Sequence, residues 1–200
     1  MIVQKATVET FQPLENSSLE ASNESLGLGI DVQVHKIESR QRQIEAKIEL
    51  PYPAEQVWNV LTDYESLSEF IPNLETSQRV DHPEGGVRIE QVGSQSALMM
   101  KFSARVVLDM EENFPEALNF DMVEGDFKGF EGQWRLAPCT DCDSKTELTY
   151  CLKVWPKRSM PIVAVEKRLA KDLPLNLQAI RRRLDDLYSS GSDPSVAAVA

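Results

Sequence analysis

Two cysteines stand at a spacing that metal sites use. Cys139 and Cys142 form a C-x-x-C pair, which lets two thiolates share one tetrahedral zinc ion. A complete site needs two further ligands, and only Cys151 and two distant histidines remain. A reversible disulfide is the other interpretation, although the pair does not begin a helix that would stabilise a thiolate. We therefore expect a turn with incidental thiols, without a bound metal ion and without a cofactor.

Nucleophilic catalysis needs a nucleophile, a base within hydrogen-bond reach and a group that orients the base. His35 lies beside the N-terminal tail and His82 lies in an Asp-His-Pro-Glu-Gly-Gly turn, so both are expected at the surface. The candidates for an acid–base pair are three carboxylates and two tyrosines: Asp63, Glu69, Glu124, Tyr64 and Tyr150. Carboxylates at helix ends are more often caps or surface charges than catalytic groups. The residues therefore predict no catalytic site and favour a protein that is not an enzyme.

The composition limits the classes of partner. The 200-residue chain has 21 Lys and Arg against 32 Asp and Glu, and its net charge of −11 repels nucleic-acid phosphates. Its longest apolar runs, such as 97–100 and 160–165, are far shorter than the ~20 residues of a membrane-spanning helix. The first residues lack the basic segment and apolar run of a signal peptide. We expect a cytoplasmic protein that does not bind nucleic acid.

The chain divides into one domain and two tails. Residues 9–29 are rich in Glu, Ser and Asn, and they hold too little apolar surface to offset the entropy of ordering. The last ten residues are small and follow a Ser-Ser-Gly stop. We predict a disordered acidic tail over 1–28, a folded domain over 29–190 and a second disordered tail over 191–200.

Hydrophobic periodicity predicts the elements that must position any site. Apolar residues at every second position predict a strand before Pro51 and six later strands joined by short turns, which favours antiparallel hairpins. The six strands cover residues 76–80, 87–94, 101–110, 117–123, 129–136 and 146–155. Pro53 is expected to begin a short helix, and a second short helix is expected to end before Pro72. An apolar stripe predicts a long helix over 160–188. These elements describe an α+β fold with a curved antiparallel sheet wrapped around a long C-terminal helix.

One segment carries a family resemblance. Residues 48–77 read IELPYPAEQVWNVLTDYESLSEFIPNLETS. The arrangement P-x-E-x-V-W-x-V-L-T-D-Y-x-x-L-x-E-F-I-P, from Pro53 to Pro72, resembles the opening signature of the polyketide cyclase/dehydrase branch of the START-like (SRPBCC) superfamily, which includes the coenzyme Q binding proteins. With the element order, the resemblance covers about residues 42–188. It implies a helix-grip fold and a deep cavity between sheet and helix, used across the superfamily for sterols, lipids, quinones and polyketides.

Alternation along the strands indicates which side chains would line such a cavity. One parity of the later strands is apolar, and the opposite parity carries charged residues such as Arg105, Asp109 and Lys153 that water can solvate. The apolar parity and the long helix together supply the predicted ligand-binding residues: Phe102, Val106, Phe120, Met122, Trp134, Tyr150, Leu152, Leu169 and Leu173. The alternative interpretation is that these side chains only fill a packed core. The resemblance favours the cavity.

Charge is segregated in the last helix. Residues 157–190 hold eight Lys or Arg against four Asp or Glu, a local charge of +4 on an otherwise acidic chain. We expect weak peripheral contact with anionic membrane through five residues: Lys167, Lys171, Arg181, Arg182 and Arg183. The alternative is a solvated helix face with cations near its C-terminus.

Together these observations predict a protein that binds, transports or sequesters a hydrophobic small molecule, with isoprenoid quinone or another lipid as the expected class. Two alternatives stay open, because one fold serves many functions. The first is a cyclase/dehydrase-type enzyme acting on a polyketide or polycyclic substrate. The second is a ribosome- or protein-interaction module without a ligand, since the superfamily also contains a bacterial ribosome-association toxin.

Overall fold

A computed structural model of the protein describes residues 29–97, 100–139 and 142–189, without the side chains of 95–102 and 140–143. Both predicted tails lie outside these residues, so their disorder stays a prediction. The helices and strands, in chain order, are β1 (Asp31–Glu38), β2 (Gln41–Leu50), α1 (Ala54–Thr62), α2 (Leu67–Phe70), β3 (Leu74–Val80), β4 (Val87–Ala97), β5 (Met100–Asn113), β6 (Ala117–Gly125), β7 (Gly129–Cys139), β8 (Cys142–Trp155) and α3 (Ile162–Tyr188).

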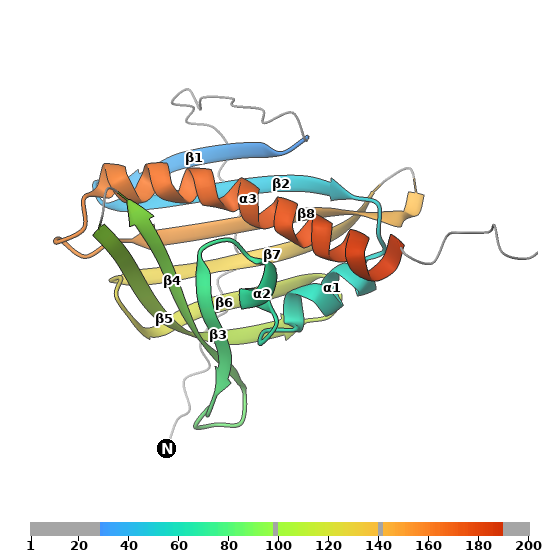
Figure 1. Ribbon diagram of the computed structural model, residues 1–200, viewed down its shortest axis with the longest axis horizontal. Coiled ribbons are helices and arrows are strands. Elements are labelled where there is room, and N and C mark those ends of the chain that lie inside the picture. Colours follow the sequence, from blue (N-terminus) through green and yellow to red (C-terminus); the bar gives the residue numbers. More distant parts are fainter. Residues whose placement is uncertain (1–28, 98–99, 140–141, 190–200) are drawn as a thin grey trace, which may run out of the picture.

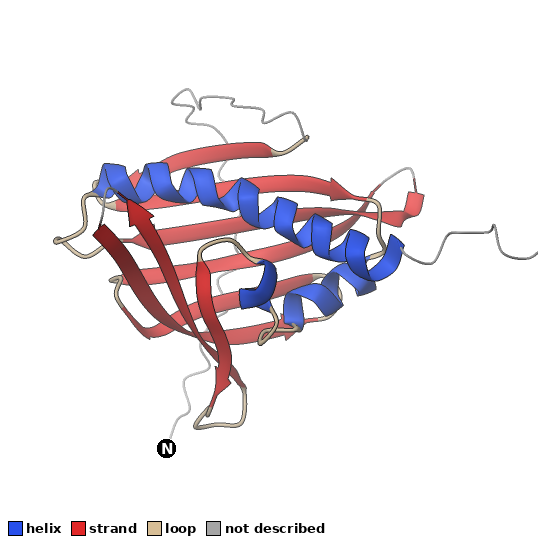
Figure 2. Cartoon of the chain, viewed as in Figure 1, coloured by secondary structure: helices blue, strands red, loops and turns tan. Residues whose placement is uncertain are grey.

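The strands form one antiparallel sheet in the order β1-β2-β8-β7-β6-β5-β4-β3 (Figure 1). Neighbours from β3 to β8 are consecutive hairpins, as the short connections predict. The long-range pairing joins β2 to β8, with Ala46 opposite Tyr150. Figure 2 shows the helices together on one face of this curved sheet.

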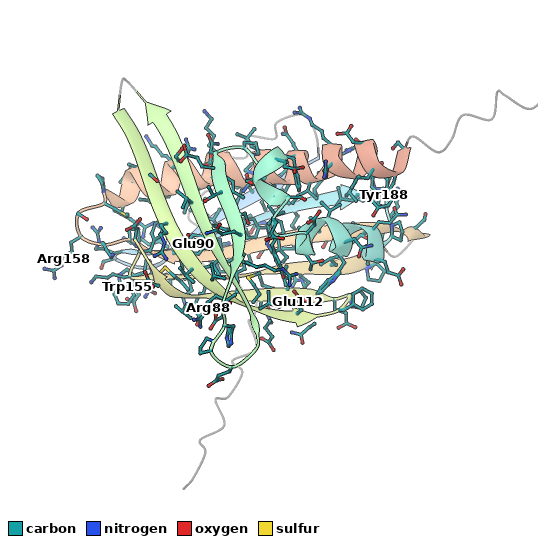
Figure 3. All side chains as sticks on the ribbon, turned by 60° about the horizontal axis from the view of Figure 1, so that its bottom comes forward. Arg88, Glu90, Glu112, Trp155, Arg158 and Tyr188 are labelled. Carbon is teal, nitrogen blue, oxygen red and sulfur yellow. The ribbon has the colours of Figure 1, made fainter. Side chains whose placement is uncertain are left out.

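The outer face of the sheet is polar. On β4, Arg88 donates a hydrogen bond to Asp109 at 2.5 Å, and Glu90 accepts one from Arg105 at 2.6 Å. Arg105 also donates to Glu124. Figure 3 shows Arg88 and Glu90 along this strand. These ion pairs confirm the parity that the sequence assigns to solvent.

The short helices close one end of the sheet. Trp58 of α1 packs edge-on against Phe114, in the turn after β5, with 5.4 Å between ring centroids. The buried Tyr64 donates its hydroxyl hydrogen bond to Glu112 at 2.7 Å. The segment after β2 is therefore fastened to the turn between β5 and β6.

α3 lies along the concave face and is anchored near both ends. Arg42 of β2 donates to Glu166 at 2.5 Å, and the Tyr52 hydroxyl donates to Asp185 at 2.6 Å. Between these anchors the helix packs on β1, β2, α1 and α2. This arrangement confirms the predicted α+β helix-grip fold.

Among the described residues, no helix combines the length and the apolar character needed to cross a lipid bilayer.

Candidate functional site

An aromatic cluster covers the concave face of β6, β7 and β8. Trp134 and Tyr150 are direct cross-strand partners, and their rings stack with 3.8 Å between centroids and 4° between planes. Phe120 lies 6.2 Å from Tyr150 and 5.9 Å from Phe130, and Phe127 lies 5.4 Å from Phe130. We call these five residues the aromatic cluster. These ring contacts join the five side chains into one group on the sheet.

Gly132 makes room for this cluster in the middle of β7. It is the register partner of Phe120 on β6 and of Leu152 on β8. A Cβ atom at this position would overlap the Phe120 ring and the backbone carbonyl of Cys151. The missing side chain therefore lets the Phe120 ring lie over β7.

Packing between α3 and the sheet changes along the helix. In the C-terminal half, Leu177, Ile180 and Leu184 are each 0% exposed. In the N-terminal half, Val165 and Leu169 are only half-buried although they continue the same apolar stripe. The C-terminal half is thus packed as tightly as a protein core, whereas the N-terminal half leaves apolar side chains incompletely covered.

The same contrast appears on the sheet. Leu148 and Val154 of β8 are fully buried, but Trp134, Phe130 and Met122 on the same concave face are only half-buried. These large inward side chains are incompletely covered by the described residues. The aromatic cluster and the N-terminal half of α3 are therefore the candidate site.

The structure places the nine predicted ligand-binding residues in three groups. The buried group is Val106, Phe120, Tyr150, Leu152 and Leu173. The group that packs against this core with partial exposure is Met122, Trp134 and Leu169. The side chain of Phe102 lies outside the described residues, and its backbone pairs with Gln95 on β4. That these residues contact a ligand stays a prediction.

Polar groups interrupt the apolar surface at three residues. Burial raises the pKa of Tyr150, which belongs to the aromatic cluster. On α3, Asp172 Oδ1 and Asn176 Oδ1 are buried without a hydrogen-bond partner among the described residues. Burial raises the pKa of Asp172, and the neighbouring Arg168 opposes that shift. Sequence reasoning missed Asp172 and Asn176, although their four-residue spacing beside Leu169 and Leu173 was available as a signal.

The acid–base candidates lie apart. Glu69 and Asp63 are exposed, and Glu124 is ion-paired with Arg105 on the outer face. The Tyr64 hydroxyl is already bonded to Glu112. The tyrosine Tyr150 alone among these candidates belongs to the aromatic cluster. Their arrangement does not form an acid–base pair at the candidate site.

The cysteines and histidines are also dispersed. Cys139 and Cys142 are Cα partners at the end of the β7–β8 pair, and the two residues between them lie outside the described ones. Cys151 is buried, and burial raises the pKa of its thiol to about 12. His82 lies 3.5 Å from Asp109 on the outer face. Among the described residues no three His, Cys, Asp or Glu side chains gather as metal ligands, and the absence of a metal from Cys139 and Cys142 stays a prediction.

The basic residues of α3 do not act as one surface. Lys167, Lys171 and Arg182 are exposed. Arg183 instead turns toward α2, where it lies over the Phe70 ring at 5.4 Å and 3.5 Å from Glu69. Arg183 therefore lies apart from the exposed cations, and contact with a membrane stays a prediction.

A separate hollow of about 180 Å³ lies between α1, α2 and the end of α3. Its lining includes Asp63, Phe70, Arg183 and Tyr188. Sites for lipid-sized ligands usually enclose about 300–1,000 Å³. This hollow is too small for such a ligand and lies away from the aromatic cluster.

Known proteins are similar to this chain in sequence or in fold. A curated relative, the "Ribosome association toxin RatA" of Escherichia coli (strain K12), is 24% identical over 149 residues, which cover 74% of this chain and 90% of the relative. The STAR-related lipid transfer protein of Xanthomonas axonopodis superposes with a TM-score of 0.63 at 18% identity, covering 84% of this chain and 96% of that chain. The Zhui aromatase/cyclase of a Streptomyces species has a TM-score of 0.60 at 14% identity, covering 76% of this chain and 98% of that chain.

The sequence profile of one family matches residues 50–181, a segment that contains α1, α2, β3 to β8 and most of α3. That family is described as polyketide cyclase / dehydrase and lipid transport. The match confirms the resemblance carried by residues 53–72. This chain belongs to the polyketide cyclase/dehydrase and lipid transport family and has the START-like helix-grip fold.

Proposed function

We propose that the protein binds and carries a hydrophobic small molecule between the aromatic cluster and the N-terminal half of α3, with an isoprenoid quinone or another lipid as the ligand class. The incomplete burial of Trp134 on β7 and of Leu169 on α3, although both pack against the core, is the observation that carries this proposal. Family membership supports it, because the family includes lipid transport.

The available binding energy is sufficient. Burying apolar surface contributes about 0.8 kcal/mol for each CH₂ group. Ten buried ligand carbons would give about 8 kcal/mol, a micromolar dissociation constant before ordering costs are subtracted. A charge introduced into the wall would oppose this term, because a charged group in an apolar site loses its hydration.

Organic extraction and mass spectrometry of the purified protein test the proposal. We expect the wild type to carry an apolar compound, Trp134→Glu to lose it and the outward neighbour variant Arg135→Ala to keep it. Circular dichroism must show that both variants fold. A wild type that carries nothing, and whose melting temperature does not change with quinones or lipids, would refute the proposal. Turnover of the recovered compound would favour the cyclase/dehydrase alternative instead.

A second candidate function is association with ribosomes. It is favoured by the relatives named ribosome association toxin, one of which is covered over 90% of its length. The exposed Lys171 and Arg182 on α3 are the cations that would contact ribosomal RNA. Cosedimentation with ribosomes at low and high salt, with Lys171→Glu/Arg182→Glu as the comparison, separates this function from ligand carriage.

A further inference from the structure

Two large apolar side chains are exposed at the end of the sheet where β6 turns into β7 and β8 leads toward α3. Trp155, the last residue of β8, is 38% exposed, although its neighbour Val154 is fully buried. Its register partner on β7 is Gly129, which has no side chain to cover the indole ring. Val123, near the end of β6, is 49% exposed. Apolar surface therefore faces water at this end.

Three cations lie at the same end. The Lys128 ammonium is 5.0 Å from the centre of the Trp155 ring, and the Lys128 backbone N–H donates to the Trp155 carbonyl at 2.8 Å. Lys157, which is exposed, donates to the Gly125 carbonyl at 3.0 Å and so ties the chain after β8 to the β6–β7 turn. Arg158 is exposed, and Figure 3 shows it at the same end of the molecule as Trp155. We call Val123, Lys128, Trp155, Lys157 and Arg158 the tryptophan surface.

The neighbouring carboxylates already have partners. Glu124 is ion-paired with Arg105, and Asp126 accepts the Arg105 backbone N–H at 2.7 Å. Glu131 is ion-paired with Lys153 at 2.6 Å. The cations of the tryptophan surface are therefore available to an external anionic group, on a chain whose net charge is −11.

We propose that the tryptophan surface docks on an anionic lipid membrane, with the Trp155 ring among the lipid headgroups and the three cations on lipid phosphates. Tryptophan is enriched at membrane interfaces, because its ring is apolar and its N–H is polar, and Lys and Arg are attracted to anionic lipids. Nucleic acid could offer phosphates and stacking bases, but an aliphatic side chain such as Val123 gains nothing from stacking. The combination favours a membrane.

This surface differs from the α3 cations expected to contact a membrane, because it precedes the helix and includes an exposed aromatic ring. Its hairpin also carries part of the candidate site, since Phe127, directly before Lys128, belongs to the aromatic cluster. A docked molecule would thus exchange its ligand with the bilayer at this end. Only this last step rests on the proposed function.

The test uses the full-length protein at low salt with vesicles of phosphatidylcholine and phosphatidylglycerol. We expect the wild type to float with these vesicles, and brominated phosphatidylcholine in them to quench its tryptophan fluorescence. Trp155→Phe should lose this quenching, because Trp58 is buried. Quenching of Trp134 by a lipid in the candidate site would persist in Trp155→Phe, so the two sources are distinguishable.

Charge variants test the cations separately. Lys128→Gln and Arg158→Gln should each weaken partitioning into the mixed vesicles about fivefold, the effect of one cation near an anionic surface. Lys47→Gln is the matched control, because Lys47 pairs with Thr149, away from the end at which Arg42 pairs with Val154. It should partition like the wild type.

The outcomes separate this inference from ligand carriage. A wild type that does not bind the mixed vesicles would overturn membrane docking, whereas carriage, measured by organic extraction, would be unaffected. Full quenching in a folded Trp155→Phe, or equal losses of partitioning in Lys47→Gln and Lys128→Gln, would also overturn it. Binding to ribosomes but not to vesicles would assign the surface to RNA instead.

Discussion

Leu169→Ala and Leu177→Ala make the same chemical change at two positions of α3 that differ in packing. Leu177 is 0% exposed in the tightly packed C-terminal half. Leu169 is half-buried in the N-terminal half, where the structure leaves apolar side chains incompletely covered. The pair therefore measures whether the two halves of the helix interface really differ.

The magnitudes follow from burial. Leu→Ala at a fully buried position costs about 2–5 kcal/mol, because the lost transfer energy is joined by the cost of a cavity. A half-buried leucine beside open space loses less transfer energy and creates no new enclosed cavity, so about 1 kcal/mol is expected. A gap of about 2 kcal/mol corresponds to a melting temperature about 4–8 °C lower for Leu177→Ala than for Leu169→Ala.

Equilibrium unfolding in urea, followed by circular dichroism on protein refolded without ligand, provides the assay. Leu169→Ala should in addition weaken binding of an apolar probe, because Leu169 lies in the proposed wall, while its loss of stability stays small. Equal free-energy losses for the two variants would mean that Leu169 is packed as completely as Leu177. The proposed space under the N-terminal half of α3 would then not exist.

Three further predictions address other parts of the molecule. Gly132→Val should lower the free energy of unfolding by about 1–3 kcal/mol, because the valine side chain would overlap the Phe120 ring. Urea unfolding measures this loss, and an unchanged unfolding midpoint would contradict the close approach of the Phe120 ring to Gly132. Because burial raises the pKa of Asp172 in the folded state, the folded protein binds more protons, so this residue contributes stability at low pH that is lost as pH rises through the raised pKa. Asp172→Asn should flatten that part of the profile, measured as melting temperature against pH, and an unaltered slope would argue against a buried carboxylate. Flotation with anionic liposomes should show weak binding that high salt or Lys171→Glu/Arg182→Glu removes. Binding that does not depend on salt would mean that these residues form only a solvated helix face.

The sheet and the long helix could be predicted from local patterns. Alternation along residues 117–123 and 129–136 assigned the inward and outward faces, because a strand with one dry face has a period of two. Turn residues between the later strands specified hairpins. The pairing of β2 with β8 is a contact between distant parts of the chain, and no local pattern in the sequence indicated it.

The site was predictable in residue type but not in packing. Periodicity identified Trp134 and Leu169 as inward, yet it could not distinguish a filled core from open space, because exposure depends on how far α3 stands from the sheet. The polar residues Asp172 and Asn176 were missed, since a carboxylate beside an apolar stripe usually faces water. Arg183 was grouped with the exposed cations, and its contact with Phe70 depends on the position of α2.

The central claim is that an apolar ligand lies against the aromatic cluster. Mass spectrometry of organic extracts from the wild type, Trp134→Glu and Arg135→Ala, purified in parallel, tests it most directly. The account predicts one apolar compound in the wild type and in Arg135→Ala, and its loss from a folded Trp134→Glu. Equal amounts of that compound in all three folded proteins would place it elsewhere and contradict the account.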